Sequence, residues 1–270
     1  MKKKKLPIAS LAILGSILIF TWILPLIYPV DPFALDAEAI LMPPSWENPL
    51  GTDRLGRDIF SRLIYGGQVS LLIGLGSAII ASLIGLVMGV SAGYFQGKID
   101  GIFVVVVDLF LTFPTFFLLL ALTSYMEASS LALILIISLT GWMGTARLLR
   151  SQSYEITQKP FIKILRVASV SKIKIIFKYF LPLLAPLFFV SFTFALSGAI
   201  LAESGLSYLG LGITPPQMSW GSMLSEGKSV MEIAWWVSFF PGLMIFLVTF
   251  SLILLSDSLQ SITNQKELNR

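Results

Sequence analysis

The sequence predicts an all-α polytopic membrane protein with six transmembrane helices. Apolar residues make up 56% of its 270 residues and charged residues only 13%, against roughly 25% charged residues in a soluble domain. The mean hydropathy is +0.86. Six apolar stretches are long enough to cross a bilayer, which takes about 20 residues of helix. Each stretch is expected to be helical because a lone segment in lipid must satisfy its own backbone hydrogen bonds, and no alternating strands indicate a β-barrel.

The six expected spans cover residues 6–28, 69–94, 101–123, 130–149, 182–202 and 234–256. The first follows Met1 and Lys2–Lys5, as the apolar core of a signal peptide would. However, its run from Leu6 to Tyr28 exceeds the usual length of about 7–15 residues, and no small-x-small cleavage site follows. We therefore expect an uncleaved first helix with its N-terminus in the cytoplasm.

The basic residues predict the orientation. With the N-terminus inside, the inner segments carry 15 of the 19 Lys and Arg residues, and the outer segments carry Arg54, Arg57, Arg62 and Lys228. Cytoplasmic loops are enriched in Lys and Arg. Both termini are therefore expected on the cytoplasmic side of a bacterial inner membrane. The same bias explains the net charge of +4, so we expect lipid contact and no nucleic-acid partner.

The first outer loop, about 29–66, contains five prolines that argue against a continuous helix. It then reads Leu50-Gly51-Thr52-Asp53-Arg54-Leu55-Gly56-Arg57-Asp58. The two glycines predict tight turns, and the alternating Asp and Arg residues predict local ion pairs. From the residues alone this is a structured loop.

The second span carries a stripe of small residues, and the third carries a charged residue. Small residues three and four apart form one stripe on the second span: Gly74, Ala78, Ala81, Gly85, Gly89 and Gly93. Such a stripe lets another helix approach closely, and a place in a substrate path is the alternative. In the third span, Pro114 is expected to kink the helix. Asp108 lies near mid-bilayer, where a charge costs roughly 2.5–3.5 kcal/mol, so it either faces a path or bonds to a neighbouring helix or paired subunit.

The segment from Arg147 to Pro182 is basic, with a single acid, Glu155. Within it, a helix over 159–170 would place Phe161, Ile164, Leu165 and Ala168 on one apolar face and Lys159, Lys163 and Arg166 on the opposite face. Such a helix either lies on the anionic leaflet or docks into a groove on a partner.

The last two spans hold few polar signals. Glu203 is expected at the outer end of the fifth span, close to water, where it lines a path or bonds to the following Gly-rich loop. Asp257 is expected to anchor the inner end of the sixth span. Trp235 and Trp236 are typical of an aromatic belt.

Three blocks, in order, resemble the dipeptide/oligopeptide/nickel permease family of binding-protein-dependent ABC importers, and its second permease subunit in particular. The first block is the loop from Leu50 to Asp58, continuing through Ser61-Arg62-Leu63-Ile64-Tyr65-Gly66. The second runs from Ala202 to Gly212, and the third holds Pro215-Pro216, Ser219-Trp220-Gly221 and Met223-Leu224. The resemblance covers nearly the whole chain.

The resemblance implies a type I ABC importer transmembrane-domain fold. Residues 1–66 would form the cytoplasmic tip, first helix and outer loop, and residues 67–270 the core, with a cytoplasmic coupling loop at about 150–181. The signature residues of the outer loop are Gly51, Thr52, Asp53, Gly56, Arg57 and Asp58. Asp108 and Glu203 are the candidates for the translocation path.

The resemblance also assigns the basic segment to coupling with an ATP-binding subunit, through Phe161, Lys163, Ile164, Leu165, Arg166, Ala168 and Ser169. The family motif begins Glu-Ala-Ala, has a Gly six residues after the Glu, and ends Leu-Pro. Aligned on Leu181-Pro182, this chain has Lys163 at the Glu position, Ile164-Leu165 at the Ala pair and Ser169 at the Gly position. A Lys in place of a Glu would require a complementary acidic group on the partner, or lipid contact.

The implied partners are a second homologous permease subunit, forming a heterodimer, two ATP-binding subunits and an extracytoplasmic substrate-binding protein. This chain lacks the Gly-x-x-x-x-Gly-Lys-Ser/Thr phosphate loop. No cofactor is therefore expected in it, and ATP with Mg²⁺ would bind the partner subunits. The expected function is import of di- and oligopeptides, without enzymatic activity in this chain.

Three other functions were weighed. The same architecture could import nickel or a metal chelate, although the absence of His and Cys leaves no strong soft ligand for free nickel. An ion-coupled secondary transporter is disfavoured by the few intramembrane charges and the lack of an inverted repeat. A membrane-embedded enzyme is disfavoured because no nucleophile–base–acid set or metal-ligand cluster occurs.

Overall fold

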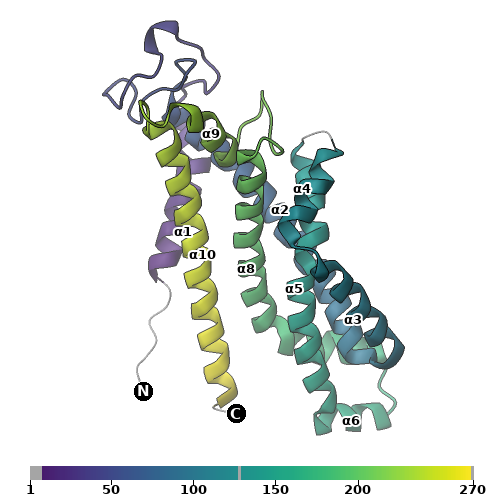
Figure 1. Cartoon of the computed structure of the whole chain (residues 1–270). Helices are drawn as coiled ribbons and strands as arrows, with labels where there is room; N and C mark the ends of the chain where they lie inside the picture. Colours follow the sequence, from purple (N-terminus) through teal and green to yellow (C-terminus); the bar gives the residue numbers. More distant parts are fainter. Residues whose placement is uncertain (1–7, 127–128, 269–270) are drawn as a thin grey trace.

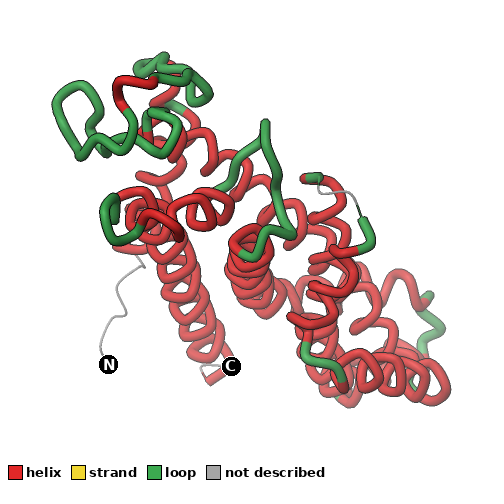
Figure 2. The backbone as a smooth tube through the Cα atoms, turned by 45° about the horizontal axis from the view of Figure 1, so that its top comes forward, coloured by secondary structure: helices red, strands yellow, loops and turns green. Residues whose placement is uncertain are grey.

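The computed structural model describes residues 8–126 and 129–268, with side chains described as far as Ser261. Across this part of the chain the backbone is helical apart from loops and turns, and the one isolated β-bridge joins Thr52 to Asp58. Figure 2 shows helices linked by loops, and most of the long loops lie at one end of the molecule. The predicted all-α class is confirmed for the described residues.

Ten α-helices follow one another along the described chain: α1 Ile8–Trp22, α2 Ile59–Phe95, α3 Gly97–Thr112, α4 Thr115–Ser124, α5 Ser130–Gln158, α6 Pro160–Val167, α7 Lys172–Ile175, α8 Leu181–Tyr208, α9 Trp220–Gly227 and α10 Trp236–Leu268. A π-helical turn, Ile176–Phe180, joins α7 to α8. Five of the spans, Ile8–Leu26, Ile59–Phe95, Ser130–Gln158, Lys172–Tyr208 and Trp236–Ser261, are long and apolar enough to cross a membrane, and α3 with α4 makes a sixth.

The structure confirms the predicted bend of the third span and moves the start of the second. The third span is bent by 79° between α3 and α4, at Pro114, as predicted from the proline. The second span begins at Ile59 rather than near 69, because Asp58 caps its first turn by accepting a hydrogen bond from Ser61 N at 2.8 Å. The expected division between residues 66 and 67 therefore falls inside a continuous helix.

The end of α10 and helix α6 lie at one end of the bundle, while α9 and the long loop after α1 lie at the other (Figure 1). Helix α1 begins about halfway along α10 and runs toward the end that holds α9. The end that holds α6 is called the inner end below, and the opposite end the outer end.

Helix α2 runs through the centre of the bundle and packs along α5. A Cβ atom at Gly89 would come within 2.5 Å of the Ala146 carbonyl oxygen, and one at Gly93 within 2.6 Å of the Arg150 carbonyl oxygen. Only glycine lets the two backbones approach this closely, so the predicted close packing is confirmed for the inner half of the stripe.

Hydroxyl groups add contacts between helices. Thr193 on α8 and Ser256 on α10 share a hydrogen bond of 2.7 Å, and Ser256 also donates to the Val190 carbonyl at 2.9 Å. Trp220 at the start of α9 is fully buried and donates from Nε1 to the Leu63 carbonyl at 2.8 Å. These bonds hold α10 to α8 and α9 to the outer end of α2.

Candidate functional site: cavity, outer loop and inner segment

A cavity of about 430 Å³ opens between α2, α4, α5 and α8. Most of the side chains that line it are small and apolar, and several Ser and Thr hydroxyl groups lie among them. Representative lining residues are Ser77, Thr115, Thr140, Gly144, Ser191 and Phe194. Ala78 and Ala81 of the small-residue stripe also border this space, so a place in a substrate path stays a prediction for that part of the stripe.

Asp108 bonds to a neighbouring helix. Its carboxylate forms an ion pair with Arg147 on α5, and the two side chains are 59% and 52% exposed. A second pair joins the same helices nearer the inner end, where Arg150 donates to both oxygens of Asp100, from Nη2 to Oδ2 at 2.6 Å. That second pair is less exposed, at 32% and 20%. The sequence signal for these partners was the presence of two acids in the third span and two arginines at the inner end of the fourth.

Glu203 is not close to water, contrary to the expectation from its place at the end of a span. The residue is fully buried, and its oxygens accept hydrogen bonds from Ser207 at 2.7 Å and Ser70 at 3.0 Å. Ser70 in turn accepts from Trp220 N, and Ser207 accepts from Ile213 N. The expected bond to the following loop is thus made through Ser207, and Glu203 does not border the cavity.

The outer loop folds around its two glycines. Gly51 and Gly56 have φ angles of 77° and 72°, in the left-handed region that favours glycine. Thr52 between them is fully buried, and its hydroxyl accepts from Met42 N at 2.8 Å and donates to the Ala39 carbonyl. The predicted tight turns are confirmed.

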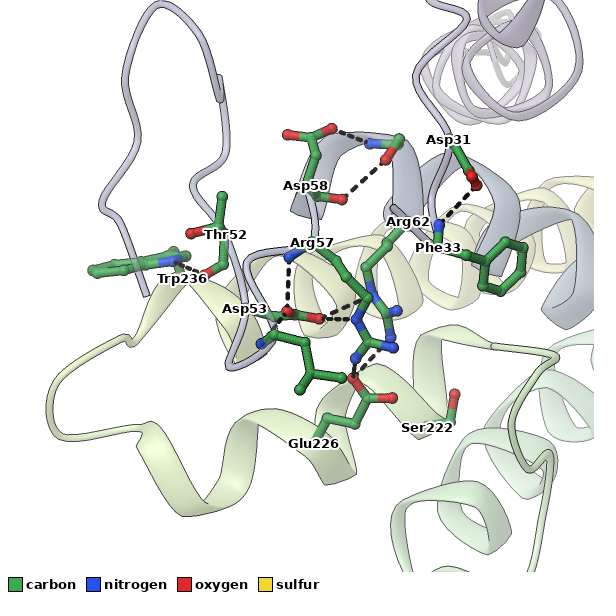
Figure 3. A network of polar contacts seen from close by, with 12 residues as sticks. Asp31, Phe33, Thr52, Asp53, Arg57, Asp58, Arg62, Ser222, Glu226 and Trp236 are labelled. Carbon is green, nitrogen blue, oxygen red and sulfur yellow. Dashed lines mark hydrogen bonds and ion pairs between the residues drawn. The ribbon is translucent and has the colours of Figure 1, made fainter. Parts of the chain in front are cut away.

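The predicted ion pairs extend well beyond the loop. Asp53 accepts from Arg57 Nε at 2.6 Å, and Glu226 on α9 accepts through one oxygen from Arg57 at 2.7 Å and from Arg62 at 2.8 Å (Figure 3). Arg62 on α2 is buried and also lies 3.5 Å from Asp53. Sequence reasoning missed Glu226, which is more than 160 residues away along the chain. Asp53, Arg57 and Glu226 border an outer pocket of about 410 Å³.

Two further residues fix this loop. Asp58 caps α2, and burial raises the pKa of its carboxyl above its ordinary value, while hydrogen bonds from Ser61 and Tyr28 act in the opposite direction. Trp236 was expected in an aromatic belt, but it is buried and donates from Nε1 to the Thr52 carbonyl at 3.1 Å. The indole of Trp236 therefore anchors the loop, while Trp235 is exposed.

The inner segment contains the short helix α6, which begins at Pro160 as its place in a first turn suggests. Ile162 is fully buried and packs in a cluster with Leu149, Ile175 and Phe180, with Leu165 half-buried beside it. Ile162 was missed because it lies outside the apolar face expected from spacing.

That expected face is divided by the structure. Ile164 is 67% exposed, and Phe161 and Ala168 are exposed as well. Val167, at 86%, and Ile173, at 71%, extend the exposed apolar surface. A two-turn helix therefore anchors itself through Ile162 and Leu165, with the Phe161 ring 6.3 Å from that of Tyr179, and leaves Ile164 and Val167 exposed.

The basic side chains of this segment turn toward aromatic rings of α2. The Arg166 guanidinium lies 5.0 Å from the Tyr94 ring centroid, and Lys172 lies 5.7 Å from that of Phe95. The expected basic face is therefore divided too. Lys163 is exposed.

Ser169 occupies a left-handed turn. Its φ angle is 54°, its N–H donates to the Arg166 carbonyl at 3.1 Å, and Val170 N donates to the Leu165 carbonyl at 3.1 Å. These are the two hydrogen bonds of a Schellman motif, whose left-handed residue is usually glycine. A glycine at this position of the family motif would adopt the left-handed conformation without strain, and this chain makes the turn with Ser169 instead.

The comparisons with known proteins agree over almost the whole chain. The family described as "Binding-protein-dependent transport system inner membrane component" matches residues 81–268. The chain is 34% identical over 267 residues to the "Dipeptide transport system permease protein DppC" of Bacillus subtilis (strain 168), covering 98% of this chain and 83% of that protein. It is 32% identical to the "Oligopeptide transport system permease protein OppC" of Haemophilus influenzae, covering 98% of this chain and 86% of that protein.

Solved structures extend the likeness to the fold. A crystal form of the inward-facing MetNI methionine ABC transporter matches with a TM-score of 0.60 at 16% identity, covering 74% of this chain and 96% of that chain. A second crystal form matches with a TM-score of 0.57. The predicted type I importer transmembrane fold is confirmed.

Proposed function

The chain belongs to the family of binding-protein-dependent transport system inner membrane components, and from that premise we propose that it forms half of the translocation path of an ATP-driven peptide importer. It is a multi-pass membrane permease of the ABC importer type, whose energy source lies outside this chain. The partners proposed are a second homologous permease subunit, two ATP-binding subunits that carry ATP and Mg²⁺, and an extracytoplasmic binding protein. The inner end, with both termini, would face the cytoplasm.

The observation that carries this proposal is the exposed apolar surface of α6. Ile164 and Val167 project from a helix that Ile162 anchors in the bundle. A helix of this kind is suited to dock into a groove on a partner. Because Ile162 is buried with Phe180 at the start of α8, a displacement of α6 would be transmitted to that long helix as a rigid body.

Transport would then proceed by alternating access. Closure of the two ATP-binding subunits would move the α6 helices of the permease pair, and the two bundles would turn the central path from the inner to the outer side. The binding protein would deliver substrate at the outer end, where Asp53, Arg57, Arg62 and Glu226 hold the loop against α9. That ion network gives the outer end a rigid docking surface.

Peptides are the proposed substrate. Relatives named for dipeptide and oligopeptide transport match nearly the full chain. The cavity walls offer hydroxyl groups, which can bond to peptide groups, and the chain has no His or Cys to bind free nickel. A metal chelate needs no such ligand, so the ligand found in the pocket of the cognate binding protein separates the two substrates.

Co-purification tests the proposal. Replacing Ile164 and Val167 together by Asp should reduce the amount of ATP-binding subunit that purifies with the permease pair at least tenfold, because two charges would face an apolar groove. Both side chains are already exposed, so the permease itself should fold as before. The matched control is Leu35→Asp, an exposed apolar position in the outer loop, which should leave the ATP-binding subunits attached. Unchanged co-purification of the double variant would contradict docking through α6.

A further inference from the structure

The two ion pairs between α3 and α5 differ in how completely each uses its hydrogen-bonding groups. Arg150 donates through two nitrogens to both oxygens of Asp100, which is the strong bidentate arrangement. Arg147 donates through one nitrogen to one oxygen of Asp108. A guanidinium has five N–H groups and a carboxylate two oxygens, so the Asp108–Arg147 pair keeps free capacity on both sides.

Arg147 lies on the side of α5 that borders the cavity. It follows the lining residues Thr140 and Gly144 at i+7 and i+3, and the lining of α5 extends as far as Leu148, so Arg147 lies at the inner edge of this wall. The lining residues of the cavity that the structure describes carry no charge. Asp108 and Arg147 are therefore the charged groups that a molecule leaving the cavity toward the inner end meets first.

The charges of the pair argue against lipid around it. More than half of each side chain is accessible, and both residues belong to membrane-spanning helices. Charged groups at this depth normally face a water-filled cavity or a polar partner rather than acyl chains. An exposed ion pair also contributes little to stability, so opening it costs little.

We propose that Asp108 and Arg147 form a charged subsite at the inner mouth of the path that binds the two ends of a zwitterionic peptide. Arg147 binds the terminal carboxylate, for which a guanidinium has matching bidentate geometry. Asp108 binds the terminal ammonium group of the same peptide or of one that follows it. Recognition through the termini is independent of side chains, and the Asp100–Arg150 pair keeps α3 aligned on α5 while the open pair exchanges partners.

This inference rests on the proposed peptide import, and the absence of cysteine from the chain allows a direct test. Single replacements Asp108→Cys and Arg147→Cys are made in the complete transporter, and inside-out vesicles are treated with membrane-impermeant methanethiosulfonates of either charge. Both cysteines should react. The anionic reagent should be favoured about fivefold at Asp108→Cys, where Arg147 remains, and the cationic reagent at Arg147→Cys, since about 1 kcal/mol acts between charges 4 Å apart in water.

The matched control is Leu109→Cys, on the same helix at the same depth and 63% exposed in the structure. Facing lipid, it should react at least tenfold more slowly. Lack of reaction at 108 and 147 would show that lipid or a subunit covers the pair, and equal reaction at 109 would show that the pair marks no path. Either result overturns the proposal.

A second measurement tests ligand class with the pair intact. Gly144→Cys places the probe in the cavity, where an added Cβ meets no atom within 4 Å. Trialanine should slow its modification at least threefold, whereas N-acetyl-trialanine amide should not, and Arg147→Gln should abolish the protection. Equal protection by both peptides, or by neither, contradicts the subsite. If the transporter fails to take up peptides at all, the proposed function fails, while the labelling of the pair still reports whether it faces water.

Discussion

Replacing Gly89 by alanine should loosen the packing of α2 against α5. The added Cβ would lie 2.5 Å from the Ala146 carbonyl oxygen and 3.1 Å from Arg150 N, while ordinary contact begins at 3.4 Å. Both opposing atoms are backbone atoms, so no side chain can turn aside. The two helices must separate by up to about 0.9 Å, which forfeits a quarter to a half of the dispersion energy at the contact.

The net cost follows from two opposing contributions. Overpacking a well-packed interface costs about 1–3 kcal/mol. Alanine is favoured over glycine in a helix by up to about 1 kcal/mol. The Gly89→Ala permease should therefore lose about 1–2 kcal/mol of stability, which lowers the melting temperature by about 2–4 °C for each kcal/mol in a chain of this size.

The assay is thermal unfolding of the purified transporter in lipid nanodiscs. Gly101→Ala on α3 is the control, because its added Cβ meets no atom within 4 Å, and it should unfold at the parent temperature or slightly above. A Gly89→Ala protein as stable as the Gly101→Ala protein would refute the close approach of α2 and α5.

Other replacements test the remaining parts of the structure. Ser169→Gly should stabilise the inner segment against local unfolding, since relieving a left-handed non-glycine residue is worth about 1 kcal/mol. Slower hydrogen exchange of the 161–170 amides would measure this gain. Glu226→Ala should cost about 2–3 kcal/mol, below the range of about 3–5 kcal/mol for breaking a fully buried pair because Glu226 is partly exposed, whereas Glu226→Gln should cost less; thermal unfolding separates the two. Glu203→Leu should release α9 and increase proteolysis near Trp220, while Glu203→Gln, which can still accept from serines, should not. Burial raises the pKa of Asp58 in the folded state, so the folded state binds its proton more tightly and stability declines as pH rises from the unfolded value of about 3.9. Asp58→Asn keeps the cap and should weaken this decline between pH 4 and 7.

The sequence was sufficient for the class, the spans and the two special backbone features. Helices long enough to cross lipid, the bend at Pro114 and the turns at Gly51 and Gly56 follow from local chemistry, which does not depend on distant residues. The packing of α2 against α5 could be predicted as a tendency, because a stripe of small residues has meaning only when another helix meets it.

Contacts between residues far apart along the chain could not be predicted from the sequence. Glu226 closes the network with Arg57 and Arg62 only because α9 folds back over the start of α2. Glu203 was expected near water because depth was inferred from its place in a span, whereas the loop after α8 covers it with serine hydroxyls.

In the inner segment, the sequence did not predict which side of α6 is buried. Helical spacing predicted one apolar face, but a helix of eight residues lying across the bundle end joins the hydrophobic cluster beneath it through two side chains, Ile162 and Leu165. Which side turns inward depends on the direction of approach of α6, and that direction is set by the Schellman turn at Ser169 and the path of the chain into α8.

Peptide uptake by the reconstituted transporter tests the central claim most directly. Proteoliposomes that contain this chain, its paired permease and the ATP-binding subunits should accumulate a labelled di- or tripeptide only when the binding protein is outside and Mg-ATP is present at the ATP-binding subunits. Dissipating ion gradients should leave the initial rate unchanged. Uptake that persists without ATP and follows a proton or sodium gradient would contradict the account.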